Sequence, residues 1–535
     1  MARDRIRPWN RVDAMVALAV SGCSLLLGAA LFVRRPDLVV GAEFLFHDAG
    51  HNLLTAHAIL SGQTLYRDIF FPYGPISAYV YAAAAWCFGN TPEVYVGVFA
   101  VVSAVNAALA YRLVRRSAGA GVALAVAVGL LALLPIPGAI AGAFISSPYI
   151  VLERTMLLLV ALTWSLPDAR STSRAVGLGL AFGLWQGIKF GGAFVGGVAI
   201  VTVDALCLTA LGWSNDSFRR WARSLLVTGV AFLGVESLWI VHAFATQPAA
   251  IAHDMIWPYF MFHAYAVVGD DVRWLTWGGW RLMVGRYLLP LTAAMLGIYG
   301  LGAWLRTLRK GREADASGSA FILLVFYGIA SCGYFHHVFH FQQFFWALVP
   351  PAAFALERAS TRARLAVAAA WAPCIWLVLH TALLTHTPAS METVRLPTGG
   401  RVVVSAAIGE RLSFLARIHA ATGGAPILYA PVGSGWHYAY GVPSASRHTF
   451  FFAPDVIRPY ERDAFVRSID RLGALVTCDD LTGPASLGGQ LLLDETVRPL
   501  VFGRLQLWQR GAGCIAYRVR SADEPPGPSP DGVQP

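Results

Sequence analysis

One acidic and one basic side chain stand where they could act on a phosphorylated lipid. Asp48 opens an amphipathic segment that ends at Gly62, shortly after the first long apolar run of the chain. Lys189 lies between glycines at the end of another apolar run. A carboxylate can take a proton from an attacking group, and a cation can stabilise the charge that develops on a phosphate leaving group. The sequence therefore predicts a carboxylate at the outer membrane surface, at the level of the lipid headgroups, and a cation at the end of a second apolar run.

Both residues also have ordinary structural roles open to them. Aspartate is a favoured N-cap, so Asp48 could simply begin the helix that follows it. A lysine at the end of a span can extend its ammonium group to the membrane interface. Charges at membrane depth are costly, however, and mark functional sites. We therefore predict a functional role for both residues, with Lys189 as a contact for phosphate.

Further polar residues near the ends of apolar runs are secondary candidates. Arg154 follows Glu153 inside one run, which suits either an internal ion pair or a second phosphate contact. Asp68 follows Arg67 directly, which suits either a local ion pair or the floor of the site. The remaining candidates for contact with substrate or carrier are His51, Tyr73, Asp254, His337 and His340.

A histidine-rich run covers residues 334–343. His340 lies four residues after His336 and three after His337, so one pair could share a helix face and suit a metal ion. The glutamate that makes such spacing diagnostic of zinc is absent. Hydrogen bonding to sugar or phosphate and packing at the interface are the other interpretations. We assign no cofactor, and a divalent metal is not required.

The composition indicates what holds these residues. Of 535 residues, 56% are hydrophobic and 13% charged, whereas soluble proteins carry about 25% charged residues. So little charge cannot cover a water-soluble particle of this size, and we predict a polytopic membrane protein. The net charge of +10 resides largely in short arginine clusters between apolar runs. That pattern is typical of cytoplasmic loops and argues against a nucleic-acid partner.

The apolar runs predict about eleven transmembrane helices, since about 20 apolar residues cross the hydrocarbon core. They cover residues 12–33, 93–113, 119–138, 148–166, 174–189, 191–212, 224–245, 283–305, 317–335, 337–357 and 364–386. With a cytoplasmic N-terminus the basic clusters fall inside, and residues 36–91 form the first outer loop. Residues 75–89 are predicted as an interfacial helix, because counting them as a span would invert the rest. Arginine outnumbers lysine, which is typical of GC-rich bacteria, so we predict the bacterial inner membrane.

The chain divides into a transmembrane domain (1–387), an extracytoplasmic α/β domain (388–520) and a disordered tail (521–535). Strands are predicted at 401–405, 426–431, 474–478 and 514–519, with helices at 410–421 and 455–472. Cys478 and Cys514 share this outer domain, where a disulfide or two free thiols in neighbouring strands would fit.

Residues 41–89 resemble the first outer loop of GT-C glycosyltransferases, the family of the protein O-mannosyltransferases and the lipid A aminoarabinose transferase. The resemblance rests on Asp48 soon after the first span, the helix leading to Leu65-Tyr66-Arg67-Asp68, the Tyr73-Gly74-Pro75 turn and the Phe88-Gly89 ending. It implies a GT-C-like membrane domain and sugar transfer from a polyprenyl-phosphate carrier to an extracytoplasmic glycan, lipid or protein. Asp48 matches the first-loop carboxylate that acts as base or acceptor-positioning group in that family, so the resemblance implies this role for Asp48. Many relatives have an acidic pair where this chain has His47-Asp48-Ala49.

Two other functions fit eleven spans. A transporter or flippase would show internal repeats and broken helices near the bilayer midplane, and we detect no repeat. A non-catalytic subunit for envelope polysaccharide assembly would use the outer domain to bind a partner.

Overall fold

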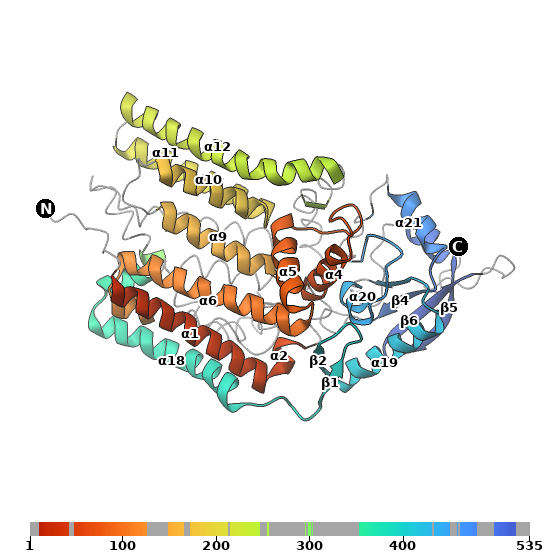
Figure 1. The fold of residues 1–535 in the computed structure, drawn as a ribbon. Coiled ribbons are helices and arrows are strands. Elements are labelled where there is room, and N and C mark those ends of the chain that lie inside the picture. The colour runs from red at the N-terminus through yellow and green to blue at the C-terminus, as the bar shows by residue number, and fades with distance from the viewer. Residues whose placement is uncertain are drawn as a thin grey trace.

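Long helices and a smaller α/β unit make up the protein, as the computed structural model in Figure 1 shows. The described residues are 10–41, 48–125, 148–164, 172–211, 214–246, 254–255, 295, 298–300, 302, 352–430, 433–449, 457, 461–478 and 497–520.

Seven long helices lie side by side in Figure 1 and coincide with seven of the predicted spans. They are α1 (Arg11–Arg34), α6 (Pro92–Ser117), α9 (Pro148–Trp164), α10 (Thr172–Gln186), α11 (Phe190–Leu211), α12 (Asn215–Thr246) and α18 (Thr361–Leu384). Within the described residues, three segments are long and apolar enough to cross a membrane: Arg11–Arg34, Pro92–Arg116 and Phe218–Trp239. The predicted spans 119–138, 283–305, 317–335 and 337–357 lie wholly or mostly outside the described residues, so the count of eleven stays a prediction.

Contacts at the helix ends fix the direction of three helices. Asp13, in the first turn of α1, pairs with Arg115 in the last turn of α6 at 2.6 Å, so these helices are antiparallel. The amide of Thr387, just after α18, donates to the carbonyl of Arg34 at 2.9 Å, so α1 and α18 end on the same side. If helices alternate across a membrane, the number of crossings from α1 to α18 must be odd.

Arg34 and Arg35 lie at the predicted outer end of the first span, although basic residues are typical of cytoplasmic loops. Both have partners nearby. Arg35 pairs with Asp37 at 2.8 Å and donates to Thr385 at 3.2 Å. Thr387 in turn donates to Asp37 at 3.0 Å. These side chains therefore fasten the connection between α18 and the C-terminal domain to the end of α1.

The first outer loop folds into short helices that lie across the end of the long ones (Figure 1). They are α2 (Pro36–Val39), α4 (Asp48–Leu60) and α5 (Pro75–Phe88). α5 has 14 residues and lies crosswise to the long helices in Figure 1. This is the position expected of the interfacial helix predicted for residues 75–89, whose location in the membrane stays a prediction.

The C-terminal domain contains two small sheets. An antiparallel hairpin joins β1 (Met391–Arg395) to β2 (Arg401–Ser405). The larger sheet has the order β3-β4-β6-β5, formed by β3 (Ile427–Ala430), β4 (Ala474–Cys478), β5 (Leu505–Gly511) and β6 (Cys514–Val519). The helices are α19 (Ala406–Ala421), α20 (Ser434–Tyr440), α21 (Arg462–Ile469) and α22 (Val497–Phe502). The four predicted strands are present, whereas β1, β5, α20 and α22 were not predicted.

One apolar core spans the junction between the two domains. Leu53 of α4, Tyr81 of α5 and Val403 of β2 belong to the same buried cluster, together with Trp436 of α20. Hydrogen bonds reinforce it, because Asn90 donates to the carbonyl of Leu53 and accepts from Tyr81. The first outer loop is thus packed between the long helices and the C-terminal domain.

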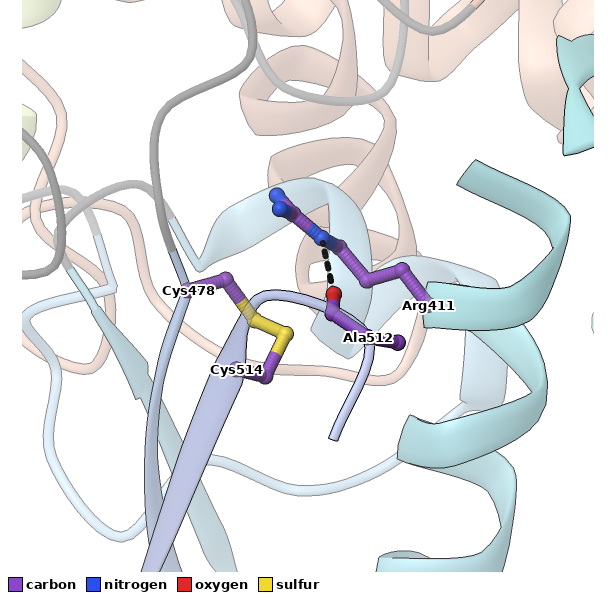
Figure 2. The surroundings of a disulfide bond; sticks show 4 residues. All are labelled: Arg411, Cys478, Ala512 and Cys514. Atoms are coloured by element: carbon purple, nitrogen blue, oxygen red, sulfur yellow. Dashed lines mark hydrogen bonds between the residues drawn. A yellow bond between two sulfur atoms is a disulfide. The ribbon is translucent and has the colours of Figure 1, made fainter. Parts of the chain in front are cut away.

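Cys478 and Cys514 form a disulfide between β4 and β6, where they are directly opposed in the antiparallel register (Figure 2). The hairpin before Cys514 turns through Ala512 and Gly513, both with positive φ, as a type I′ turn requires. Arg411 of α19 donates to the carbonyl of Ala512 at 3.3 Å. Of the two alternatives for these cysteines, the structure contains the disulfide, which suits an oxidising compartment.

Replacing both Cys478 and Cys514 by Ala should destabilise the C-terminal domain. The disulfide closes a loop with a sequence separation of 36 residues, and chain entropy gives such a loop about 4 kcal/mol of stabilisation. Thermal unfolding of the purified protein should begin at lower temperature, with earlier proteolysis of the outer domain. Replacing Cys23 and Cys87, which are free and exposed, should leave both measurements unchanged. Equal unfolding temperatures in the two double variants would contradict the prediction.

Candidate functional site

The helix that carries the predicted base is anchored by the C-terminal domain. α4 begins at Asp48, whose side chain lies outside the described part of the structure. One turn later, His51 Nδ1 lies 3.0 Å from Ser434 Oγ of α20, and Ser434 is within hydrogen-bonding distance of Thr449. His51 also stacks on Phe71 with ring centroids 5.5 Å apart. Position and orientation of the N-terminal turn of α4 are therefore set from the outer domain.

Buried histidines gather at this junction. Burial lowers the pKa of His51 to about 3. Burial also lowers the pKa of His437 to about 4, against a hydrogen bond to the Val442 carbonyl. Burial lowers the pKa of His448 as well. The rings of His51 and His437 are therefore neutral at neutral pH.

Acidification below about pH 6.5 should destabilise this junction. A histidine whose pKa is lowered by folding binds its proton preferentially in the unfolded state, so its stabilising contribution is complete above pH 6.5 and declines as the pH falls. The slope is about 1.4 kcal/mol per pH unit for each such histidine. The unfolding temperature of detergent-solubilised protein should therefore be lower at pH 5.5 than at pH 7.5.

Two variants of one helix make this test specific. His51→Gln should reduce the difference between the two pH values, because one buried titrating ring is removed. His57 lies on the same helix but is exposed, so His57→Gln should preserve the difference. A wild-type protein with equal stability at both pH values would overturn the interpretation.

The Tyr73-Gly74-Pro75 turn docks by its backbone on the turn between α10 and α11. Gly74 N donates to the carbonyl of Ile188 at 3.0 Å, and Ile76 N donates to that of Gly187 at 2.8 Å. A Cβ at Gly74 would stand 2.1 Å from the Gly187 oxygen, so only glycine allows this approach. The first outer loop and the turn that carries Lys189 are therefore joined.

Lys189 forms an ion pair at the end of α9. Its Nζ lies 3.2 Å from Glu153 Oε2, and Trp185 Nε1 donates to Glu153 Oε1 at 3.3 Å. Gly192 leaves room for this carboxylate, since a Cβ there would meet Glu153 Oε1 at 1.9 Å. Arg154, the next residue of α9, is buried as well. Glu153, Arg154 and Lys189 together carry a formal charge of +1, which can attract a phosphate.

Asp68 forms the local ion pair that was one of its two alternatives. Its carboxylate lies 2.8 Å from Arg67 Nη2 and accepts from the amide of Thr64 at 2.7 Å. Both side chains of the pair are partly exposed. Tyr73 packs edge-on against Phe71, and its carbonyl accepts from the hydroxyl of Tyr66 at 2.7 Å. Both residues shape the loop between α4 and α5.

Asp254 belongs to a buried charge cluster that we define as Asp254, Arg447, His448 and Glu461. Arg447 donates to both oxygens of Asp254, at 2.7 and 3.0 Å, and its Nε donates to Glu461 at 2.6 Å. The same guanidinium donates to the Tyr66 carbonyl, and the Phe70 amide donates to the Arg447 carbonyl. The charge cluster therefore binds the first loop, residue 254 and the C-terminal domain together.

The electrostatics of the charge cluster keep its ion pairs charged. Burial opposes the charge on Arg447, but the carboxylates of Asp254 and Glu461 outweigh it and raise its pKa. Burial acts to raise the pKa of Glu461, whereas His448 and Arg447 lower it to about 2. Arg447 and Glu461 were not predicted as site residues, since neither stands in a recognisable motif.

The predicted residues His337 and His340 lie outside the described residues. Among the residues that the structure describes, no group of three or more His, Cys, Asp or Glu side chains is placed to hold a metal ion.

Solved structures with the same architecture include ArnT from Cupriavidus metallidurans. Its apo structure gives a TM-score of 0.55 at 14% identity, covering 94% of this chain and 97% of that one. The structure bound to undecaprenyl phosphate gives 0.52 at 15% identity, with 96% and 98% covered. The oligosaccharyltransferase AglB from Archaeoglobus fulgidus gives 0.49 at 13% identity, with 95% and 75% covered. No protein-family model and no curated protein sequence matches the chain.

The likeness to ArnT establishes the fold. The chain shares the architecture of ArnT over nearly the whole length of both proteins. The resemblance to GT-C proteins drawn from residues 41–89 is confirmed at the level of the fold.

Proposed function

We propose that this protein is a membrane glycosyltransferase that moves a sugar from a polyprenyl-phosphate carrier to an acceptor on the extracytoplasmic side. The observation that carries the proposal is the docking of the first outer loop on the Lys189 turn, within the fold of ArnT. That docking joins the helix that begins at Asp48 to a cation-bearing segment at one end of the long helices. ArnT itself has been solved with undecaprenyl phosphate, a lipid of the class proposed here as carrier.

Asp48 serves in this proposal as general base or acceptor-positioning group. It accepts the proton of the acceptor hydroxyl as that oxygen attacks the anomeric carbon of the donor sugar. The bond between the anomeric carbon and the phosphate oxygen breaks, and the polyprenyl phosphate leaves with both electrons. The new glycosidic bond keeps the acceptor oxygen, so atoms and charge balance.

Lys189 and Arg154 are the proposed contacts for the carrier phosphate. Glu153 holds the Lys189 ammonium group in place at 3.2 Å, and the local formal charge remains +1 before the lipid binds. Stabilising the negative charge on the departing phosphate lowers the barrier to transfer. The acceptor is proposed only as a hydroxyl of an envelope glycan, lipid or protein.

Comparing envelope glycans from cells with and without the gene tests the function. One sugar substitution should be missing from the deletion strain and should return when the gene is restored. Glycans that are unchanged by the deletion would contradict the proposal.

Lys189→Met should weaken binding of undecaprenyl phosphate to the reconstituted protein by about 10- to 100-fold, the range of a hydrogen bond to a charged group. Lys189→Arg keeps the charge and should retain most of the binding. Lys310→Met, in a predicted cytoplasmic cluster, should have no effect.

The methionine variant also leaves Glu153 without its lysine, so a further variant separates stability from binding. Combining Lys189→Met with Glu153→Gln removes both charges and should recover thermal stability without recovering binding. Wild-type affinity in that double variant would show that Lys189 does not contact the phosphate.

A further inference from the structure

A buried carboxylate on α12 has no role in the reaction described so far. The Glu236 side chain is 2% exposed, whereas its neighbours Leu233 and Leu238 are 62% and 77% exposed. Among the residues that the structure describes, Glu236 Oε1 accepts no hydrogen bond. This apolar helix exposes leucines on its surface and buries a carboxylate. Burying the carboxylate costs free energy. Intramembrane acids of this kind mark functional sites.

The packing of α12 on α10 shows where Glu236 lies along the axes of the long helices. Thr228 of α12 lies against Gly179 of α10, and Val235 lies against Gly183. The two helices therefore run parallel, and the next turn of α12 reaches the level of Gly187. This is the residue whose carbonyl binds the first outer loop. Glu236 is thus close to the level at which the first outer loop docks.

Trp239 places the same face of α12 against the first outer loop. It lies one turn after Glu236 and packs on a buried cluster that includes Tyr66, Phe71 and Met255. The indole Nε1 is buried and lies near enough to the Glu236 carboxylate to interact with it. Within the described part of the chain, neither Trp239 Nε1 nor Glu236 Oε1 has a hydrogen bond of standard geometry. A buried acceptor and a buried donor therefore lie one helical turn apart beneath the loop.

We infer that Glu236 and Trp239 form a subsite that binds hydroxyl groups of the transferred sugar. The inference rests on the proposed function and adds a substrate class to it. A carboxylate accepts hydrogen bonds from sugar hydroxyls, the indole N–H donates one, and the aromatic ring covers an apolar sugar face. Because carboxylates repel each other, the subsite selects neutral or basic sugars and rejects uronic acids.

Binding to the reconstituted protein tests the subsite. Undecaprenyl phosphate without a sugar is compared with undecaprenyl phosphate carrying a neutral hexose, a neutral pentose, an amino sugar or a uronic acid. For wild type, at least one neutral or basic sugar should tighten binding about 10- to 100-fold over the bare lipid phosphate. The uronic acid should give no such gain.

Two variants remove the acid with different effects on packing. Glu236→Gln keeps the shape of the side chain, and Glu236→Leu places an apolar side chain on an apolar helix. If one variant fails to fold, the other still tests the subsite. Both should lose the gain from the sugar while binding the bare lipid phosphate as wild type does. Ser237→Ala, at the adjacent exposed position, removes a hydroxyl that donates to the Gly234 carbonyl of the same helix, and this variant should keep the gain.

The outcomes separate the two proposals. A wild-type preference for one sugar that survives in both Glu236 variants overturns the subsite and leaves the glycosyltransferase in place. Tighter binding of the uronic acid than of the other sugars also overturns the subsite. If wild type binds none of the lipids, the proposed function fails and the subsite with it.

Discussion

Asp48→Asn should reduce sugar transfer by about 100- to 10,000-fold, the contribution typical of a positioned general base. Asparagine has nearly the same shape and is also a favoured N-cap, so α4 should still begin at residue 48. Transfer is measured with reconstituted protein and lipid-linked donor, and the amount of protein in the membrane is measured alongside. Loss of transfer at normal abundance is the expected result.

Asp68→Asn is the matched control for the loss of one acid from the same loop. Asp68 is engaged in a partly exposed pair with Arg67, and such pairs contribute about 0–1 kcal/mol. Transfer by this variant should stay within a few-fold of wild type. If Asp48→Asn retains full activity, or if Asp68→Asn loses as much, the role given to Asp48 is wrong.

Arg447→Leu should lower the free energy of unfolding by about 3–5 kcal/mol, because it leaves Asp254 and Glu461 buried without their counter-charge. It also removes the hydrogen bond to the Tyr66 carbonyl, so the loop between α4 and α5 should loosen. The unfolding temperature should fall, and proteolysis should cut residues 61–74 earlier than in wild type.

A second change and a matched control test the origin of that loss. Adding Asp254→Leu to Arg447→Leu removes one of the stranded charges and should recover part of the stability, a coupling that a double-mutant cycle measures. Arg504 pairs with Asp470 on the surface of the same domain, and Arg504→Leu should cost little. Equal losses from the two arginine variants would contradict the importance given to the charge cluster.

Local patterns were enough to predict much of the fold. Short apolar runs located β2, β4 and β6 to the residue. Long apolar runs located seven helices. Strands β1 and β5 escaped prediction because Met391–Arg395 and Leu505–Gly511 are half-exposed and carry polar residues on both faces.

The partners of the charged residues could not be predicted, since they depend on contacts between distant segments. Glu153 stands beside Arg154 in the sequence, yet its ion-pair partner across the fold is Lys189. Asp254 was predicted as a candidate contact for substrate or carrier, whereas in the structure both of its carboxylate oxygens accept hydrogen bonds from Arg447 of the C-terminal domain. Nothing in the sequence near Arg447 indicates that it binds two outer loops.

The hydrogen bonds that join Gly74 and Ile76 to the Gly187–Ile188 segment are made by main-chain atoms. Amides and carbonyls are common to every amino acid, so neighbouring residues can be exchanged without losing these bonds, provided that positions 74 and 187 stay free of a side chain. The residues that would recognise a lipid headgroup can therefore change between homologues while the fold stays the same. A shared architecture at 14–15% identity is what such tolerance would permit.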